Sequence, residues 1–335
     1  MHLARTDYSC SAACRILARM NNYSRLAALV VIVSLLPGCS QPPVGFYETR
    51  CHDAVEYVRR DGRPLRMDIF VPQDGRSARP AVVIFHGGGW AVGNRGYNRD
   101  MARFLASMGY TAATADYRLW PDGGVHPAPV QDALAAVKFL RKNHAEYGVD
   151  SCCIAVAGES AGGHLALLVG LAQNRSIFGD DAYPDVDTSV SAVIDIYGPT
   201  DVLPMYERGG WLVRRLCRGY AGCRPEENPE QWKQLSPVSH AWPGAPPVLI
   251  VHGERDSVVP FSQATAMAEA LEKAGSPYEL VKVPGAGHGW GLSFNSVASQ
   301  RTLPVIVDFL SRVFKDHRLA PGARLTDSPR TAANH

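Results

Sequence analysis

CIAVAGESAGGHLALLVGLAQ, residues 153–173, contains a short apolar run, the pentapeptide GESAG and a longer apolar segment. The first run predicts a strand buried on both faces, and the last predicts a largely apolar helix. A serine between them stands on a sharp strand-to-helix turn, where the residues two before and two after it need almost no side chain. Gly158 and Gly162 meet that demand, so Ser160 is a candidate nucleophile. The alternative is a glycine-rich packing turn.

A second glycine-rich segment, HGGGW at residues 86–90, follows directly on the apolar run at 81–85. Acyl transfer builds negative charge on a carbonyl oxygen, and amide donors aimed at that oxygen stabilise it. Glycine lets the chain turn its N–H groups inward without steric cost, as in the oxyanion loop of lipases and esterases. We therefore expect the amides of Gly88, Gly89 and Ala161 to bind the oxyanion. The alternative is a flexible glycine linker.

Two later loops carry the partners that a serine nucleophile needs. A serine hydroxyl is a poor nucleophile until a base removes its proton. Of the 11 histidines, His288 is the candidate base because its loop, residues 284–290, follows the last predicted strand. The base needs a carboxylate that fixes its tautomer, and Asp256 is better placed for this than the alternative, Glu254. The chain order of serine, acid and histidine is that of the α/β-hydrolases.

Strand-like and helix-like segments alternate through most of the chain, which predicts a mostly parallel sheet with helices on both faces. The expected strands are 55–59, 65–71, 81–85, 111–115, 153–157, 190–196, 248–251 and 280–283. The expected helices are 98–108, 129–143, 161–173, 263–274 and 297–314. Residues 201–246 interrupt the alternation and predict a small insertion over the active site, within a single catalytic domain at 49–317.

Composition excludes some classes of protein. Of the 335 residues, 46% are hydrophobic and 20% are charged, which is ordinary for a folded globular protein. The formal net charge is only +2 and there is no long basic run. Nothing in the charge pattern therefore indicates a nucleic-acid partner.

The N-terminal residues 1–39 predict an export signal. An apolar run at 26–36 has the length of a signal-peptide core, and the following LPGC resembles the lipobox whose cysteine is acylated. We expect Cys39 to carry a lipid anchor, placing the protein on the periplasmic side of a membrane, and we expect translation to start near Met20. A plain secretory signal is the alternative. Residues 40–48 would form a tether, and the tail at 318–335 lacks apolar periodicity and predicts disorder.

Eight cysteines fit an exported protein better than a cytosolic one. Cys217 and Cys223 are close in sequence, in the loop-like stretch CRGYAGC, and are the best candidates for a disulfide. The alternative is that all of the cysteines are free, because spacing alone does not fix which α-carbons are close enough to pair.

Several motifs together resemble one branch of the α/β-hydrolases, which includes the hormone-sensitive-lipase-like and the acetyl-xylan or feruloyl esterase-like carboxylesterases. They are HGGGW at 86–90, DYRL at 116–119, GESAGGHLALL at 158–168, DIYGPTD at 195–201, VHGERDSVVP at 251–260 and GAGHGW at 285–290. The resemblance covers about 55–314. It implies an α/β-hydrolase fold, a triad of Ser160, Asp256 and His288, and no cofactor or metal.

The resemblance also sets the expected reaction. It implies a serine carboxylesterase that hydrolyses short-chain acyl esters, including acetyl groups on carbohydrates, with a small-molecule ester as partner. The chain departs from many relatives at Glu159, where they have aspartate. HGGGW is also similar to the oxyanion loop of kynurenine formamidases, so an arylformamidase or amidase is one alternative. A non-catalytic, surface-anchored binding protein on a hydrolase scaffold is the other. The oligomeric state is left open.

Overall fold

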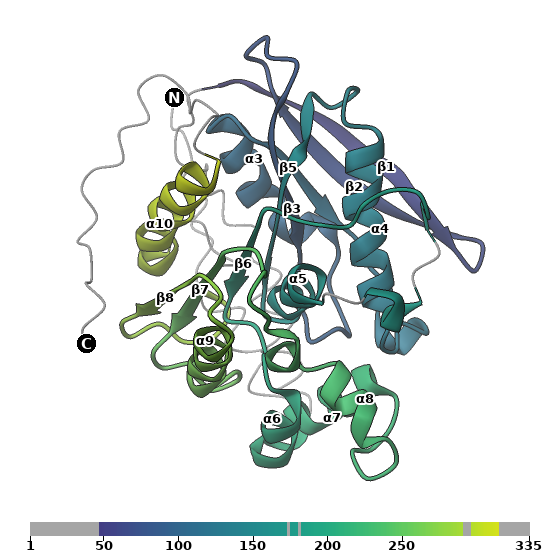
Figure 1. The fold of residues 1–335 in the computed structure, drawn as a ribbon, viewed down its shortest axis with the longest axis vertical. Helices are drawn as coiled ribbons and strands as arrows, with labels where there is room; N and C mark the ends of the chain where they lie inside the picture. Colours follow the sequence, from purple (N-terminus) through teal and green to yellow (C-terminus); the bar gives the residue numbers. More distant parts are fainter. Residues whose placement is uncertain (1–46, 173–174, 180–181, 291–295, 315–335) are drawn as a thin grey trace, which may run out of the picture. The chain divides into compact units, whose positions relative to one another are not determined.

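The computed structural model describes residues 47–172, 175–179, 182–290 and 296–314 (Figure 1). The expected signal segment with Cys39, nearly all of the expected tether and the expected C-terminal tail at 318–335 lie outside the described residues. In the part of the chain that is described, no helix is both long enough and apolar enough to cross a bilayer.

An eight-stranded sheet forms the centre of the described chain, with the strand order β1-β2-β4-β3-β5-β6-β7-β8. β2 pairs antiparallel with both β1 and β4, whereas every other neighbouring pair is parallel. The prediction of a mostly parallel sheet is therefore confirmed. The strands are β1 (Thr49–Arg60), β2 (Arg63–Pro72), β3 (Arg79–Phe85), β4 (Thr111–Ala115), β5 (Val149–Glu159), β6 (Ala192–Ile196), β7 (Val248–Gly253) and β8 (Tyr278–Val283).

Helices cover both faces of the sheet, as predicted. α4 (Ala128–Lys142), α5 (Ala161–Leu171) and α9 (Ser262–Ala274) pack on one face. α3 (Arg99–Ser107) and α10 (Val297–Val313) pack on the other. Successive residues of a strand point to opposite faces, so Ile84 and Phe85 of β3 belong to different core clusters.

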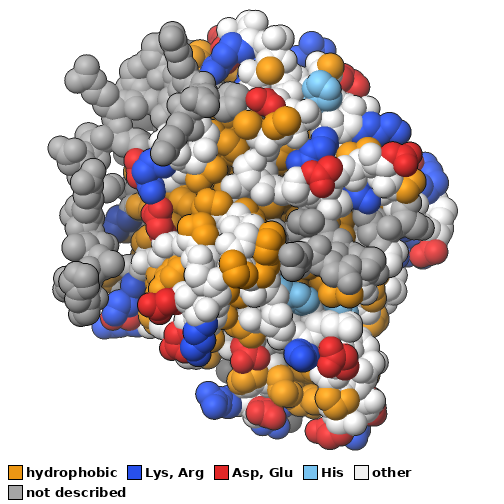
Figure 2. Space-filling view, in the orientation of Figure 1, with side chains coloured by type: hydrophobic (Ala, Val, Ile, Leu, Met, Phe, Trp, Pro, Cys, Tyr) orange, Lys and Arg blue, Asp and Glu red, His pale blue; other side chains and the backbone are white. Residues whose placement is uncertain are grey.

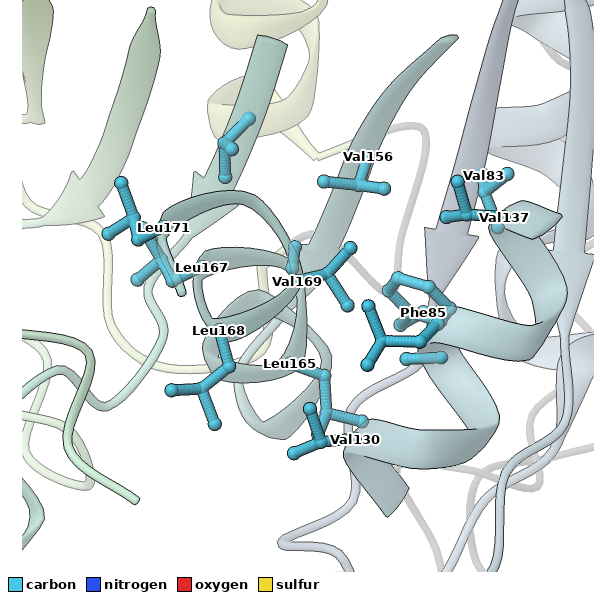
Figure 3. Packing of buried hydrophobic residues seen from close by; sticks show 14 of the residues in the cluster. Val83, Phe85, Val130, Val137, Val156, Leu165, Leu167, Leu168, Val169 and Leu171 are labelled. Atoms are coloured by element: carbon cyan, nitrogen blue, oxygen red, sulfur yellow. The ribbon is translucent and has the colours of Figure 1, made fainter. Parts of the chain in front are cut away.

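α5 is the most deeply buried helix of this arrangement. Figure 3 shows its leucine and valine side chains between the strands and α4. Every residue from Ala161 to Leu171 is buried, and a helix that is apolar all round can be stable only when enclosed on all sides. This packing fixes the N-terminus of α5, directly after Ser160, at the end of β5.

The interruption at 201–246 is helical rather than a set of turns. It contains α6 (Val202–Arg208), α7 (Trp211–Ala221) and α8 (Pro229–Gln234), which lie together at the lower end of the molecule in Figure 1. Figure 2 shows acidic and basic side chains interspersed over the face in view, in keeping with the small net charge.

The expected disulfide between Cys217 and Cys223 is wrong, because both cysteines are free. The stretch CRGYAGC is not a loop. Cys217 lies inside α7, and the chain leaves the helix only at Gly222, which has a left-handed φ of 75°. Burial raises the pKa of the Cys217 thiol to about 12.

Candidate active site

Ser160 stands on a tight turn between β5 and α5. Its φ of 53° and ψ of −121° lie outside the regions that residues with a side chain usually adopt. A β-carbon added to Gly158 would lie 2.3 Å from the carbonyl oxygen of Gly162. One added to Gly162 would lie 2.0 Å from the carbonyl oxygen of Phe85. Glycine is therefore required on both sides of the serine, for the reason that the sequence predicts.

Three side chains from three separate loops meet at this turn. Nε2 of His288 lies 3.0 Å from Oγ of Ser160, and Nδ1 of His288 lies 2.7 Å from Oδ2 of Asp256. The other oxygen of Asp256 accepts hydrogen bonds of 2.9 Å from the amides of Val258 and Val259. A carboxylate at Nδ1 favours the tautomer with the proton on that nitrogen, which leaves the lone pair of Nε2 facing the serine hydroxyl.

The alternative acid, Glu254, does not approach His288. Its carboxylate is exposed and lies 3.5 Å from the ammonium group of Lys282. The sequence interpretation missed another neighbour of the acid, His252, whose Nε2 lies 3.6 Å from Oδ2 of Asp256. Burial lowers the pKa of His252, so this imidazole is neutral at neutral pH, and it contacts the carbonyl oxygen of Val259 at 2.8 Å. The four-residue spacing of His252 and Asp256 was the available signal.

The glycine loop after β3 lies directly beside the nucleophile. A β-carbon added to Gly87 would be 3.3 Å from Cβ of Ser160. Gly88 and Gly89 have φ values of 120° and 60°, which glycine adopts without strain. Within the described residues, no acceptor takes the amides of Gly88, Gly89 and Ala161. Three amide donors of the glycine loop and the nucleophile turn are therefore available to a ligand.

Trp90 connects this loop to the helical insertion. Its indole stacks on the ring of Tyr220 in α7, with centroids 4.5 Å apart and an interplanar angle of 11°. Its Nε1 donates to Nδ1 of His164 in α5 at 3.3 Å, and Nε2 of His164 lies 2.7 Å from the carbonyl oxygen of Leu235. Trp90 is buried although its φ is 56°. The insertion therefore braces the glycine loop, which the sequence did not reveal.

Ion pairs hold the far end of the same loop. The guanidinium of Arg95 contacts Asp116 at 2.8 Å and Asp68 at 2.9 Å, and its backbone amide donates to Asp116 at 2.8 Å. Asp68 is buried and also pairs with Arg99. The DYRL motif, whose first residue is Asp116, thus anchors the glycine loop to the sheet.

Two buried carboxyl groups flank the nucleophile turn. Oε2 of Glu159 accepts the hydroxyl of Tyr197 at 2.6 Å, and Oδ1 of Asp195 accepts the amide of Gly198 at 2.9 Å. Burial raises the pKa of both groups, that of Asp195 to about 7. Across the described ranges, no three His, Cys, Asp or Glu side chains are grouped so that they could hold a metal ion.

The BD-FAE family model matches residues 67–271, from β2 into α9. The chain belongs to the BD-FAE family. The matched segment of this BD-FAE protein includes the glycine loop, Ser160 and Asp256, and ends before His288.

Curated and solved relatives agree with this assignment. The chain is 34% identical to esterase LipC of Mycobacterium tuberculosis over 244 residues, which are 70% of this chain and 59% of LipC. The matched segments span 59%, 63% and 60% of the lengths of LipC, LipM and LipQ of this organism, so these relatives are considerably longer proteins.

Among solved structures, esterase Est2 of Thermogutta terrifontis superposes with a TM-score of 0.67 at 30% identity, covering 83% of this chain and 95% of Est2. A truncated carbohydrate esterase from gut microbiota gives a TM-score of 0.69 at 25% identity, covering 82% of this chain and 99% of that one. Est2 has also been solved with propionate bound and phosphonylated by sarin. The α/β-hydrolase fold and the resemblance to its carboxylesterases are thereby confirmed.

Proposed function

We propose that this BD-FAE protein is a serine carboxylesterase that hydrolyses short-chain acyl esters through an acyl-enzyme on Ser160. The observation that carries the proposal is the hydrogen-bonded series from Oγ of Ser160 through the His288 imidazole to the Asp256 carboxylate, at 3.0 and 2.7 Å. Esterase relatives of the same fold support the reaction class.

In the first half of the reaction, Oγ of Ser160 attacks the ester carbonyl while Nε2 of His288 takes the hydroxyl proton. Asp256 stabilises the imidazolium that forms. The amides of Gly88, Gly89 and Ala161 donate to the oxyanion of the tetrahedral intermediate. When this intermediate collapses, the carbon–oxygen bond to the alcohol breaks and the alcohol leaves with the proton from the imidazolium.

In the second half, a water molecule attacks the acyl-enzyme. His288 now takes a proton from the water and returns it to Oγ as the acid leaves. The cycle is balanced because one water is consumed for each ester cleaved, and no electron transfer is involved. The residues already described supply every proton-transfer step.

The proposed substrates are small acyl esters, with acetylated carbohydrate as one class to be tested. The match to a carbohydrate esterase supports the carbohydrate class, whereas Est2 with bound propionate supports a short acyl group. A panel of acetyl, propionyl, butyryl and octanoyl p-nitrophenyl esters would rank acyl length. Acetylated xylo-oligosaccharides and N-formylkynurenine would distinguish a carbohydrate esterase from a formamidase.

The deciding experiment is the substitution Ser160→Ala, assayed with p-nitrophenyl acetate. We expect turnover to fall to the background rate, because no other hydroxyl is placed at His288 among the described residues. Ser311→Ala, which alters a half-buried serine of α10, is the matched control and should keep wild-type activity. Substantial turnover by folded Ser160→Ala protein would refute the role of Ser160.

A further inference from the structure

Glu159 occupies an unusual position for a carboxylate. It directly precedes Ser160 at the end of β5, and only 5% of its surface is exposed. Burying a charge is costly unless hydrogen bonds or opposite charges compensate. The compensation here comes from the hydroxyl of Tyr197, at 2.6 Å from Oε2. The backbone amide of Gly87 in the glycine loop also favours the charged form, although burial raises the pKa of Glu159 overall. Two of the loops that form the site therefore act on this carboxylate.

Tyr197 joins this carboxylate to the histidine loop. It follows β6 with a left-handed φ of 45°, which is strained for a bulky side chain. Its backbone amide donates to the carbonyl oxygen of Val251 at 2.8 Å. Its ring meets the imidazole of His288 edge to face, with centroids 4.9 Å apart, and the indole of Trp290 at 5.2 Å. The ring of Tyr197 therefore fills the space between Glu159 and His288.

The second carboxylate oxygen of Glu159 belongs to a residue that shares a cavity with two further hydrogen-bond donors. Oε1 of Glu159, Nδ2 of Asn98 and Nε1 of Trp290 are buried, and none has a protein partner among the described residues. All three residues line one cavity of about 20 Å³. A polar cavity of this size suits one water molecule. Both nitrogens are donors that favour the ionised carboxylate and so counteract the burial that raises the pKa of Glu159.

We propose, building on the proposed esterase function, that Glu159 is a positioning residue that acts on His288 through Tyr197. Its carboxylate holds the Tyr197 ring against the imidazole and adds negative charge near the imidazolium that forms when Ser160 is deprotonated. Asp256 holds the imidazole of His288 at Nδ1. Aspartate at position 159 would keep the charge, but its carboxylate would sit one methylene farther from the Tyr197 hydroxyl.

Among the described residues, few ionisable groups surround Glu159, Tyr197 and His288. Tyr197, Tyr117 and His288 interact with Glu159, while Asp256 and His252 are the other ionisable neighbours of the imidazole. The side chains that α3 and α10 contribute to the cavity are uncharged: Met101, Ser299, Thr302, Leu303 and Ile306. Removing the charge of Glu159 therefore removes one electrostatic stabilisation of the His288 imidazolium, while the stabilisation by Asp256 remains.

The test compares Glu159→Gln, Glu159→Asp and Tyr197→Phe with the wild-type chain, using p-nitrophenyl acetate over a range of pH. For Glu159→Gln we expect kcat to fall about 10- to 100-fold, the effect of losing one charge-assisted hydrogen bond, with little change in KM. We also expect the acid limb of kcat/KM to move by roughly half a pH unit to lower pH, because the imidazolium loses a nearby negative charge.

The other two variants distinguish the effect of the charge of Glu159 from the effect of how the Tyr197 ring is held. Tyr197→Phe should lower kcat but move the acid limb of kcat/KM less than Glu159→Gln does. Glu159→Asp should lower kcat while the acid limb stays at its wild-type pH. Tyr110→Phe is the matched control, because it removes a buried hydroxyl that has no partner among the described residues and should leave the kinetics unchanged. If Glu159→Gln does not fold, Tyr197→Phe still tests the link.

If Glu159 and Tyr197 only stabilise the fold, the variants should give a different result. Glu159→Gln and Tyr197→Phe would then lower the melting temperature while kcat and the pH profile of the folded fraction stayed at wild type, and that outcome would overturn the proposal. The proposed function is tested separately. If Ser160→Ala stays active, the esterase mechanism itself fails; if Ser160→Ala is inactive but Glu159→Gln matches wild type, only the inference about Glu159 fails.

Discussion

Asp195→Asn should make the stability of the protein less dependent on pH. Asp195 of β6 is fully buried, its Oδ1 accepts the amide of Gly198, and its Oδ2 has no partner among the described residues. Burial raises its pKa from the ordinary 3.8 to about 7. The native state therefore binds this proton more tightly than the unfolded state does, so its stabilising effect is complete below pH 3.8 and is lost as the pH rises through 7.

The difference between these two pKa values corresponds to a change of about 4 kcal/mol in the free energy of unfolding between low pH, where Asp195 is protonated, and high pH, where it is ionised. Asparagine has the shape of the protonated acid but no charge, so its contribution should not change with pH. The free energy of unfolding of Asp195→Asn minus that of wild type should therefore rise by up to about 4 kcal/mol from pH 4 to pH 9.

Urea denaturation at several pH values measures this difference directly. Glu272→Gln, which neutralises an exposed carboxylate of α9, is the control and should track wild type. Parallel curves of unfolding free energy against pH for Asp195→Asn and wild type would show instead that Asp195 has the same proton affinity in the folded and unfolded chain.

Three further predictions concern the acid of the triad, the nucleophile turn and the N-terminal cysteine. Asp256→Asn should lower kcat roughly 10⁴-fold by favouring the wrong imidazole tautomer, whereas Glu254→Gln should stay near wild type in the same p-nitrophenyl acetate assay; equal losses would contradict the assignment. Gly162→Ala should prevent accumulation of soluble protein or sharply lower the melting temperature, because its β-carbon would lie 2.0 Å from the carbonyl oxygen of Phe85; a normal melting curve would count against the tight turn. Cys39→Ala should abolish incorporation of labelled palmitate in cells and release the protein from the membrane fraction; unchanged labelling would remove the proposed lipid anchor.

The fold was predictable where strands are continuous apolar runs. Residues 81–85 and 153–157 have no polar face, so they indicate strands buried on both sides, and β3 and β5 contain them. The helices of the insertion were not predictable in the same way. α7 lies between glycines at positions 209–210 and 222 and carries three arginines. Its burial depends on tertiary contacts such as the stack of Tyr220 on Trp90.

The candidate site was predictable for residues that follow strands at one edge of a parallel sheet. Ser160, Asp256 and His288 each lie in a loop that follows a strand, and the structure brings them within hydrogen-bonding distance. The contact between Glu159 and Tyr197 joins residues 38 apart, and no local pattern encodes it. The anchor at Cys39 stays a prediction.

Mapping a covalent adduct identifies the nucleophile of this chain. The full chain is incubated with a fluorophosphonate, its mass is measured intact, and the modified peptide is then sequenced by mass spectrometry. We expect one adduct per chain, located on Ser160, with hydrolysis of p-nitrophenyl acetate lost in proportion to labelling. An adduct on another residue that abolishes activity, or full activity in chains whose Ser160 is modified, would contradict this prediction.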